Sequence, residues 1–348
     1  MIYQGVELYN VEALTPVEEP GGYLLSRIPH EVRVKLNPKA QITAFDGCGC
    51  ELRFNLEGEA VKVTLARMPE DPIGRTGLAE VYYGSFQGSY LESPRAIGEA
   101  PQAILVRPPA KLKLLKQLTA EHHLPYAPEL VRIILPYDWR YCLLGIEGSC
   151  SPPRPEQAPR RKLLVYGSSI THGGVALHPT GTYAMRLARL LEADLINLSF
   201  AGSALLEAEM AEYISQRTDW ELATLELGIN VVHSWPVEEF ARKVDYFIST
   251  VAERNRDKWI FCLDLFTSAL DYTGNPKAGE FRTVVREKVA SLNLPKLVYL
   301  SGRDLLTGVA GLSADLLHPS AEGMEEIAGS LYRVITAAAP ELRPARER

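Results

Sequence analysis

Apolar and polar positions follow two different periodicities in the two halves of the chain. In the first half, short runs in which apolar and polar residues alternate are separated by Gly and Pro at intervals of roughly ten residues. This alternation predicts half-buried antiparallel strands. We expect such strands at 40–45, 51–56, 60–65, 79–83, 103–106 and 131–135. Their regular spacing is typical of a β-sandwich or jelly roll. Residues 111–120 fit either a short helix or a charged loop.

In the second half, continuous apolar runs alternate with longer amphipathic segments. The runs predict strands at 163–166, 195–198, 222–227, 259–265 and 297–300. The amphipathic segments predict helices at 183–191, 205–217, 237–255, 281–292 and 321–338. Such alternation predicts an α/β fold in which helices cover both faces of a parallel sheet, with ligands bound beyond the carboxyl ends of the strands.

A Pro-rich, polar stretch separates the two halves. We therefore expect an accessory β-sandwich domain over 1–150, a linker over 151–161 and a catalytic α/β domain over 162–348. A length of 348 residues is consistent with two domains.

The net charge and the distribution of apolar residues argue against some classes of binding partner. The formal net charge of −6 argues against nucleic acid or an anionic membrane as the main partner. The chain has no apolar run of about 18 residues, and its first residues lack the basic and apolar regions of a signal peptide. We therefore expect a cytoplasmic protein without a membrane partner. Homo-oligomerisation is left open.

The five cysteines do not predict a metal site. Cys48 and Cys50 are separated by a single residue, and no second pair with metal-ligand spacing follows. We interpret all five as free thiols and expect neither a metal nor an organic cofactor. Two aromatic groups, at 82–90 and 137–141, could stack on sugar rings, but packing within the sandwich is the favoured interpretation.

Polar residues follow the predicted parallel strands. Ser169 comes just after the first strand, Gly202 after the second and Asn230 after the third. Asp315 and His318 precede the last helix. Because the carboxyl ends of parallel strands share one edge of the sheet, we expect these five residues to converge there.

Together these residue types supply the groups that acyl transfer needs. A serine hydroxyl requires a base to accept its proton, and His318 can do so while Asp315 holds the imidazole in the correct tautomer. The backbone N–H groups of Ser169 and Gly202, with the side-chain amide of Asn230, can stabilise an oxyanion. The sequence therefore predicts a Ser-His-Asp esterase.

The same blocks resemble those of the SGNH (GDSL-type) hydrolases over roughly residues 162–340. The resemblance implies a flavodoxin-like sheet and the same roles for the nucleophile, oxyanion donors and Asp-x-x-His pair. Ser168 and Val231 depart from the pattern, because the family usually has Asp at both positions. A β-sandwich preceding such a domain is similar to the arrangement of carbohydrate acetylesterases. This implies acetyl esters of sugars or oligosaccharides as substrates. Alternatives are lipid or short-chain acyl esters, or a catalytically silent carbohydrate-binding protein.

Other motifs are weaker. Thr171 stands where a Gly-x-Ser-x-Gly elbow requires glycine, and no phosphate-binding glycine motif follows the first strand. We expect His172 to line the pocket or cap the turn, and we assign no chemistry to His178 or His233. Trp235 fits either a wall of the acyl pocket or core packing.

Overall fold

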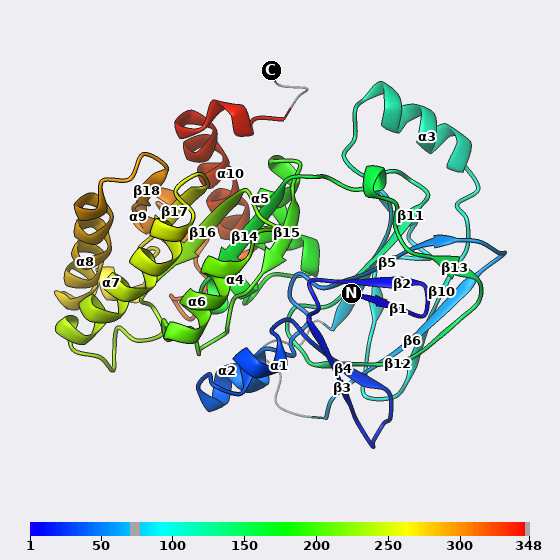
Figure 1. The fold of residues 1–348 in the computed structure, drawn as a ribbon, viewed down its shortest axis with the longest axis horizontal. Coiled ribbons are helices and arrows are strands. Elements are labelled where there is room, and N and C mark those ends of the chain that lie inside the picture. The colour runs from blue at the N-terminus through cyan, green and yellow to red at the C-terminus, as the bar shows by residue number, and fades with distance from the viewer. Residues whose placement is uncertain (70–76, 345–348) are drawn as a thin grey trace.

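A computed structural model describes residues 1–69 and 77–344 of the chain; the last four residues of the predicted catalytic domain lie outside this range. Two antiparallel sheets formed by the N-terminal half pack beside a parallel sheet with helices on both faces (Figure 1). This confirms the predicted fold class, a flavodoxin-like α/β region preceded by a β-sandwich.

The two antiparallel sheets enclose one apolar core. The first has the order β1 (Ile2–Tyr3), β2 (Val6–Tyr9), β5 (Glu51–Leu56), β11 (Leu130–Ile134), β7 (Leu78–Tyr83) and β8 (Phe86–Gln87); in addition β13 (Cys150–Ser151) pairs with β5 and β9 (Arg95–Ala96) with β7. The second has the order β10 (Gln102–Val106), β6 (Val61–Arg67), β12 (Tyr141–Glu147), β4 (Tyr23–Ser26) and β3 (Ala13–Pro16). Inward residues such as Phe54, Val63 and Ile133 are fully buried between them.

One predicted strand is wrong. Residues 40–45 belong mainly to helix α2 (Pro38–Thr43), which follows the short helix α1 (His30–Arg33). The reason lies just upstream: Asn37 caps α2 by accepting a hydrogen bond from the Ala40 N–H (3.0 Å), and Pro38 occupies the first turn. Residues 111–120, left open between helix and loop, form most of α3 (Leu112–Glu121).

Helices α1 and α2 pack beside the parallel sheet rather than within the sandwich. Ile28, Leu36 and Ala40 are buried in the same apolar cluster as Leu164 of the central strand. The Pro-rich segment, in turn, lies on the first antiparallel sheet, since β13 pairs with β5 and Gln157 of the 3₁₀ helix η1 (Pro155–Gln157) exchanges hydrogen bonds with the Asn55 side chain. The N-terminal half therefore completes the core around the parallel sheet.

The parallel sheet has the strand order 2-1-3-4-5. Its strands are β15 (Asp194–Asn197), β14 (Lys162–Tyr166), β16 (Leu222–Glu226), β17 (Trp259–Leu263) and β18 (Leu297–Leu300). One face is covered by α6 (Ala208–Gln216), α7 (Val237–Arg254) and α8 (Lys277–Leu292), the other by α5 (Tyr183–Leu190) and α10 (Ala321–Ala338). Short helices α4 (Ser169–His172) and α9 (Gly302–Leu305) follow β14 and β18.

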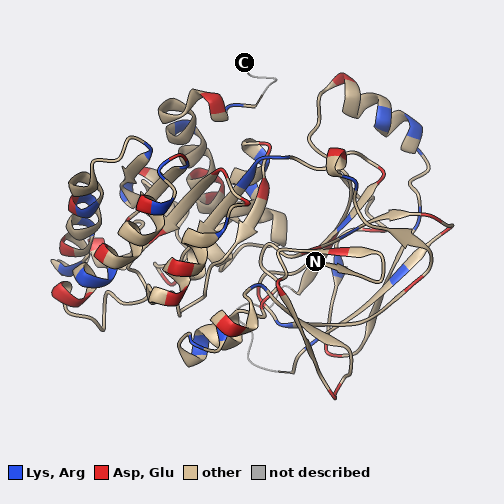
Figure 2. Cartoon of the chain, viewed as in Figure 1, with Lys and Arg blue, Asp and Glu red and all other residues tan. Residues whose placement is uncertain are grey.

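Charged residues of both signs are interspersed over the outer helices α7 and α8 (Figure 2). Within the described part of the chain, no helix combines the length and apolar character needed to cross a membrane.

Candidate active site

The turn after β14 presents Ser169 at the start of α4. Ser168 caps this helix, because its hydroxyl accepts a hydrogen bond from the Ile170 N–H (3.2 Å). Gly167 lets the turn close tightly, since a Cβ there would lie 2.3 Å from Thr171 Oγ1 and 2.6 Å from Glu226 Oε2. The chain therefore leaves the buried strand abruptly, and Ser169 remains partly exposed at the carboxyl end of the sheet.

The loop before α10 brings His318 to this serine. Ser169 Oγ lies 2.8 Å from His318 Nε2, and His318 Nδ1 lies 2.6 Å from Asp315 Oδ2. Leu316, between them, has a φ of 54°, a left-handed conformation that is uncommon for a non-glycine residue. The three predicted triad residues thus lie in one hydrogen-bonded chain.

Asp315 is held as an acceptor. Its Oδ1 accepts hydrogen bonds from the backbone N–H groups of Leu317 and His318 (both 2.9 Å) and from the Ser313 hydroxyl (2.8 Å). Partial burial raises the pKa of Asp315, but the hydrogen bonds, led by that of the His318 side chain, outweigh burial and hold it well below its usual value. An ionised Asp315 fixes a proton on His318 Nδ1 and leaves Nε2 free to accept the serine proton.

The loops after β15 and β16 meet at the carboxyl edge of the parallel sheet. Gly202 is exposed and has a φ of 62°, which favours glycine. The side-chain oxygen of Asn230 accepts a hydrogen bond from the Ala204 N–H (3.0 Å), which joins the two loops and leaves the Asn230 amide nitrogen for another acceptor. Both predicted oxyanion residues thus lie on loops at the carboxyl edge that carries Ser169.

Sequence reasoning missed Glu226, a buried carboxyl at the end of β16. Its Oε2 accepts hydrogen bonds from the Ser168 N–H (2.6 Å) and the Thr171 hydroxyl (3.1 Å). Burial raises its pKa, although the hydrogen bonds from Ser168 and Thr171 oppose the shift. The signal was present in the sequence, because a single acidic residue interrupts the apolar run of the third strand.

The two departures from the family pattern have different surroundings. Ser168 is buried and caps α4. Val231 is fully buried in the apolar cluster beneath the sheet, where an aspartate would place an uncompensated charge. The remaining candidates also differ: Trp235 is partly buried against the same cluster, whereas His233 is exposed.

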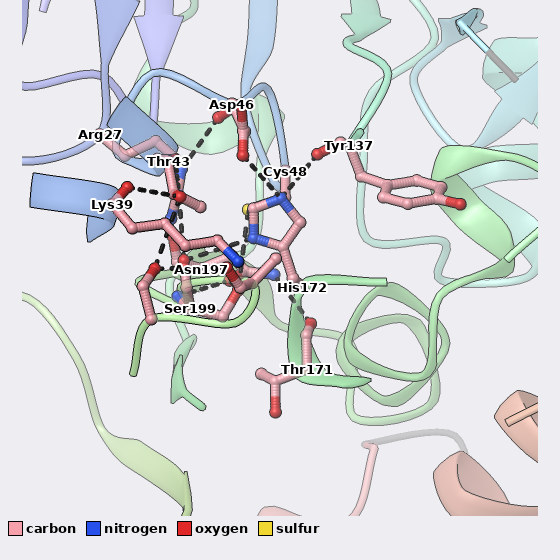
Figure 3. A network of polar contacts seen from close by, with 12 residues as sticks. Arg27, Lys39, Thr43, Asp46, Cys48, Tyr137, Thr171, His172, Asn197 and Ser199 are labelled. Atoms are coloured by element: carbon pink, nitrogen blue, oxygen red, sulfur yellow. Dashed lines mark hydrogen bonds and ion pairs between the residues drawn. The ribbon is translucent and has the colours of Figure 1, made fainter. Parts of the chain in front are cut away.

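His172 neither lines an open pocket nor caps the turn with its side chain, contrary to our expectation. The ring is fully buried in a polar network between α4 and the N-terminal half (Figure 3). Its Nε2 lies 2.8 Å from the carbonyl oxygen of Tyr137, and its Nδ1 lies 3.4 Å from Cys48 Sγ. Burial, assisted by the charge of Arg27, lowers the pKa of His172 to about 3, so the ring is neutral at pH 7.

The cysteines, the two aromatic groups and His178 were also considered from the sequence, and the structure shows where each of them lies. All five cysteines are free thiols. The rings of the aromatic group at 137–141 are buried, as the packing interpretation predicts. In the group at 82–90 that interpretation fits Tyr83, which is buried, but it is wrong for Tyr90, which is 89% exposed. His178 Nδ1 lies 3.3 Å from Glu80 Oε2 of β7, a contact between the two halves. Among residues 1–69 and 77–344, no group of three or more His, Cys, Asp or Glu side chains could hold a metal ion.

Comparisons with known proteins identify the family of the chain. Residues 160–336 match the GDSL-like Lipase/Acylhydrolase family. A search of curated protein sequences found no match.

Several solved structures share the fold along almost the whole chain. A salicylyl-acyltransferase, SsfX3, from a tetracycline biosynthetic pathway has a TM-score of 0.72 and 18% identity over 96% of this chain and 94% of its own. A putative GDSL-like lipase from Bacteroides ovatus has a TM-score of 0.67 and 16% identity over 96% of this chain and 98% of its own. A family two carbohydrate esterase from Cellvibrio japonicus has a TM-score of 0.61 and 14% identity over 98% of this chain and 97% of its own. With its parallel sheet and its family match over half its length, the chain belongs to the GDSL-like lipase/acylhydrolase family.

Proposed function

We propose that the protein is a serine esterase that hydrolyses small acyl esters, acetyl above all, on carbohydrates. The observation that carries the proposal is the chain of contacts from Ser169 Oγ to His318 Nε2 (2.8 Å) and from His318 Nδ1 to Asp315 Oδ2 (2.6 Å). A turn serine has no structural need of an imidazole that a carboxylate orients, so this arrangement favours nucleophilic catalysis.

In the acylation step, Ser169 Oγ attacks the ester carbonyl while His318 Nε2 takes the hydroxyl proton. The negative charge of the tetrahedral intermediate is stabilised by the backbone N–H groups of Ser169 and Gly202 and by the Asn230 amide. His318 then gives its proton to the departing alcohol, and the acyl group stays on Ser169.

In the deacylation step, a water molecule takes the place of the alcohol. His318 removes a proton from that water, which attacks the acyl carbon, and the same three donors stabilise the second oxyanion. The proton on His318 returns to Ser169 Oγ as the carboxylic acid leaves. Asp315 stays ionised throughout, in keeping with its lowered pKa.

Support for a carbohydrate ester comes from the whole-chain arrangement. The family two carbohydrate esterase from Cellvibrio japonicus has the same fold over 98% of this chain. Lipid or longer acyl esters remain the competing substrates in the test of this proposal.

The test measures hydrolysis of p-nitrophenyl acetate, butyrate and octanoate, followed by release of acetate from acetylated oligosaccharides. We expect kcat/KM to fall as the acyl chain lengthens. The Ser169→Ala variant should lose at least about a thousandfold in kcat, because only substrate binding and the oxyanion donors would remain to accelerate the reaction. A fluorophosphonate should label wild-type protein on the peptide that contains Ser169.

Ser168→Ala is the matched control. It removes the neighbouring serine that caps α4, and loss of a helix cap lowers the free energy of unfolding by about 1 kcal/mol. The protein should stay folded with Ser169 and His318 present, so kcat should fall by less than about tenfold. Equal activity of Ser169→Ala and wild type would overturn the nucleophile assignment. A preference for octanoate would overturn the acetyl assignment and favour lipid esters.

A further inference from the structure

A lysine from the N-terminal half reaches the oxyanion side of the candidate active site. A Cβ at Gly202 would lie only 2.3 Å from Lys39 Nζ and 3.2 Å from its Cε, so the ammonium group rests directly on the glycine. Lys39 belongs to α2 and is separated from Gly202 by more than 160 residues of sequence. In Figure 3 its side chain extends from the helix toward the loop that carries Ser199.

Several hydrogen bonds fix α2 against this loop. The Asn37 side chain donates to the carbonyl oxygen of Ser203 (3.0 Å) and to the Glu207 carboxylate. Arg27, which is fully buried, uses one nitrogen to bridge the carbonyl oxygens of Thr43 (2.8 Å) and Ser199 (2.9 Å). The backbone of Lys39 is therefore held in a constant position relative to the Gly202 loop.

The Lys39 ammonium has no acidic partner within the described residues. No carboxylate lies within ion-pair distance of it, and Lys39 as a residue is exposed. Two acidic side chains on the same part of the molecule are otherwise engaged. Glu207 accepts from Asn37, and Asp46 is buried beneath the loop beside His172. An accessible cation in a protein of net charge −6 is suited to bind an anion supplied by the substrate.

We propose that Lys39 forms a cationic subsite that binds a negatively charged group of the ester substrate, close to its carbonyl. The proposal rests on the esterase function above and names the substrate class: an ester whose acyl or alcohol part carries a carboxylate, sulfate or phosphate. Lys39 is then a specificity residue that the sandwich-bearing half contributes to the catalytic half. It acts in binding and takes no part in bond breaking.

Equilibrium binding to the Ser169→Ala protein tests the subsite without turnover. Two pairs of esters distinguish the source of the charge. In the first pair, mono-p-nitrophenyl succinate carries a carboxylate in its acyl group and p-nitrophenyl butyrate is its neutral counterpart. In the second pair, 3-carboxyphenyl acetate carries a carboxylate in its alcohol part and phenyl acetate is its neutral counterpart. Lys39→Met should weaken binding of the charged member of at least one pair by about tenfold and leave the neutral members within about twofold. Lys39→Arg should retain most of the preference, and added salt should reduce it.

Lys35→Met is the matched control, because it removes the same charge from an exposed lysine on the same segment and should change neither pair. An unchanged preference in Lys39→Met for both pairs would overturn the subsite. Equal weakening of charged and neutral esters would also overturn it, since the lysine would then serve the shape of the site. Hydrolysis by wild-type protein is measured separately, so an inert wild type would count against the esterase function alone.

Discussion

Two buried residues near the turn that carries Ser169, His172 and Asp46, have pKa values shifted in opposite directions. Asp46 Oδ2 lies 3.4 Å from His172 Nε2. Burial raises the pKa of Asp46 to about 7, although Arg27 opposes the shift, and burial lowers the pKa of His172 to about 3. In the folded protein both side chains are therefore neutral between these values, and the one proton of the pair resides on Asp46.

Because of this arrangement, the titrations of Asp46 and His172 cancel in the free energy of unfolding. In the unfolded chain, between about pH 4 and pH 6.5, the aspartate is ionised and the histidine is protonated, so the pair again holds one proton. Stability depends on pH only where the folded and unfolded states bind different numbers of protons. The pair as a whole should contribute no slope in this window.

Single substitutions should expose the two slopes with opposite signs. In Asp46→Asn, only the unfolded state binds a proton, on His172, so stability relative to wild type should rise with pH by up to about 1.4 kcal/mol per unit. In His172→Gln, only the folded state binds a proton, on Asp46, so relative stability should fall by a similar amount. Urea unfolding at pH 4.5, 5.5 and 6.5 measures both differences. Two variants that run parallel to wild type would contradict the shared proton.

At the scale of elements, the parallel sheet was predictable because each strand is a continuous apolar run bounded by turn residues. All five strands and five long helices of the second half lie where the sequence predicts them, with small shifts at their ends. The wrong strand at 40–45 has a local cause. Gln41, Ile42 and Thr43 suggest a strand, but the cap at Asn37 and the apolar face of Ala40 and Ala44 fit a helix packed beside the parallel sheet.

Residues of the candidate site are likewise predictable where a local motif marks them and not where only long-range contacts bring them together. Ser169, Asp315 and His318 could be proposed because each belongs to a short motif, and the topology of a parallel sheet makes them meet. Lys39 and Arg27 could not, because their contacts span more than 150 residues of sequence and involve a helix for which the sequence pattern predicts a strand. Short motifs thus predict the candidate triad, whereas the side chains that surround it from the N-terminal half could be found only in the structure.

Helix α2 offers a test of how firmly this element is held. Asn37→Ala removes both the cap on Ala40 and the contacts to Ser203 and Glu207, so we expect a loss of about 2 kcal/mol in the free energy of unfolding. Asn37→Ser retains a cap acceptor but lacks the amide donor, and should lose about half as much. Equal stability of the alanine variant and wild type in urea titrations would show that packing alone holds the helix.

At the scale of the whole molecule, a buried ion network joins the sandwich to the edge of the parallel sheet. Arg53 of β5 donates two hydrogen bonds to Asp194 of β15 (both 2.9 Å) and one to Glu51 (2.8 Å). Arg132 of β11 donates to both carboxylate oxygens of Glu51 (2.5 and 2.7 Å), one of which also accepts from Arg53. The Tyr126 hydroxyl donates to Asp194. Burial raises the pKa of Glu51, but the two arginines outweigh it and lower the pKa to about 2. Glu51 therefore stays ionised at all but strongly acid pH.

Breaking this network should destabilise the molecule far more than breaking a surface pair. Asp194→Asn removes the carboxylate that compensates Arg53, whose side chain is only 2% exposed, and such a loss costs about 3 kcal/mol or more. Lys62→Met, which removes one partner of a pair between two half-exposed or exposed side chains, is the control and should change stability by less than about 1 kcal/mol. Urea unfolding measures both. Because Asp194 ties the sandwich to the sheet that carries Ser169, esterase activity in Asp194→Asn should be lost at the same urea concentration as the fold. Activity lost well before the fold would mean that the two halves can separate while each remains folded.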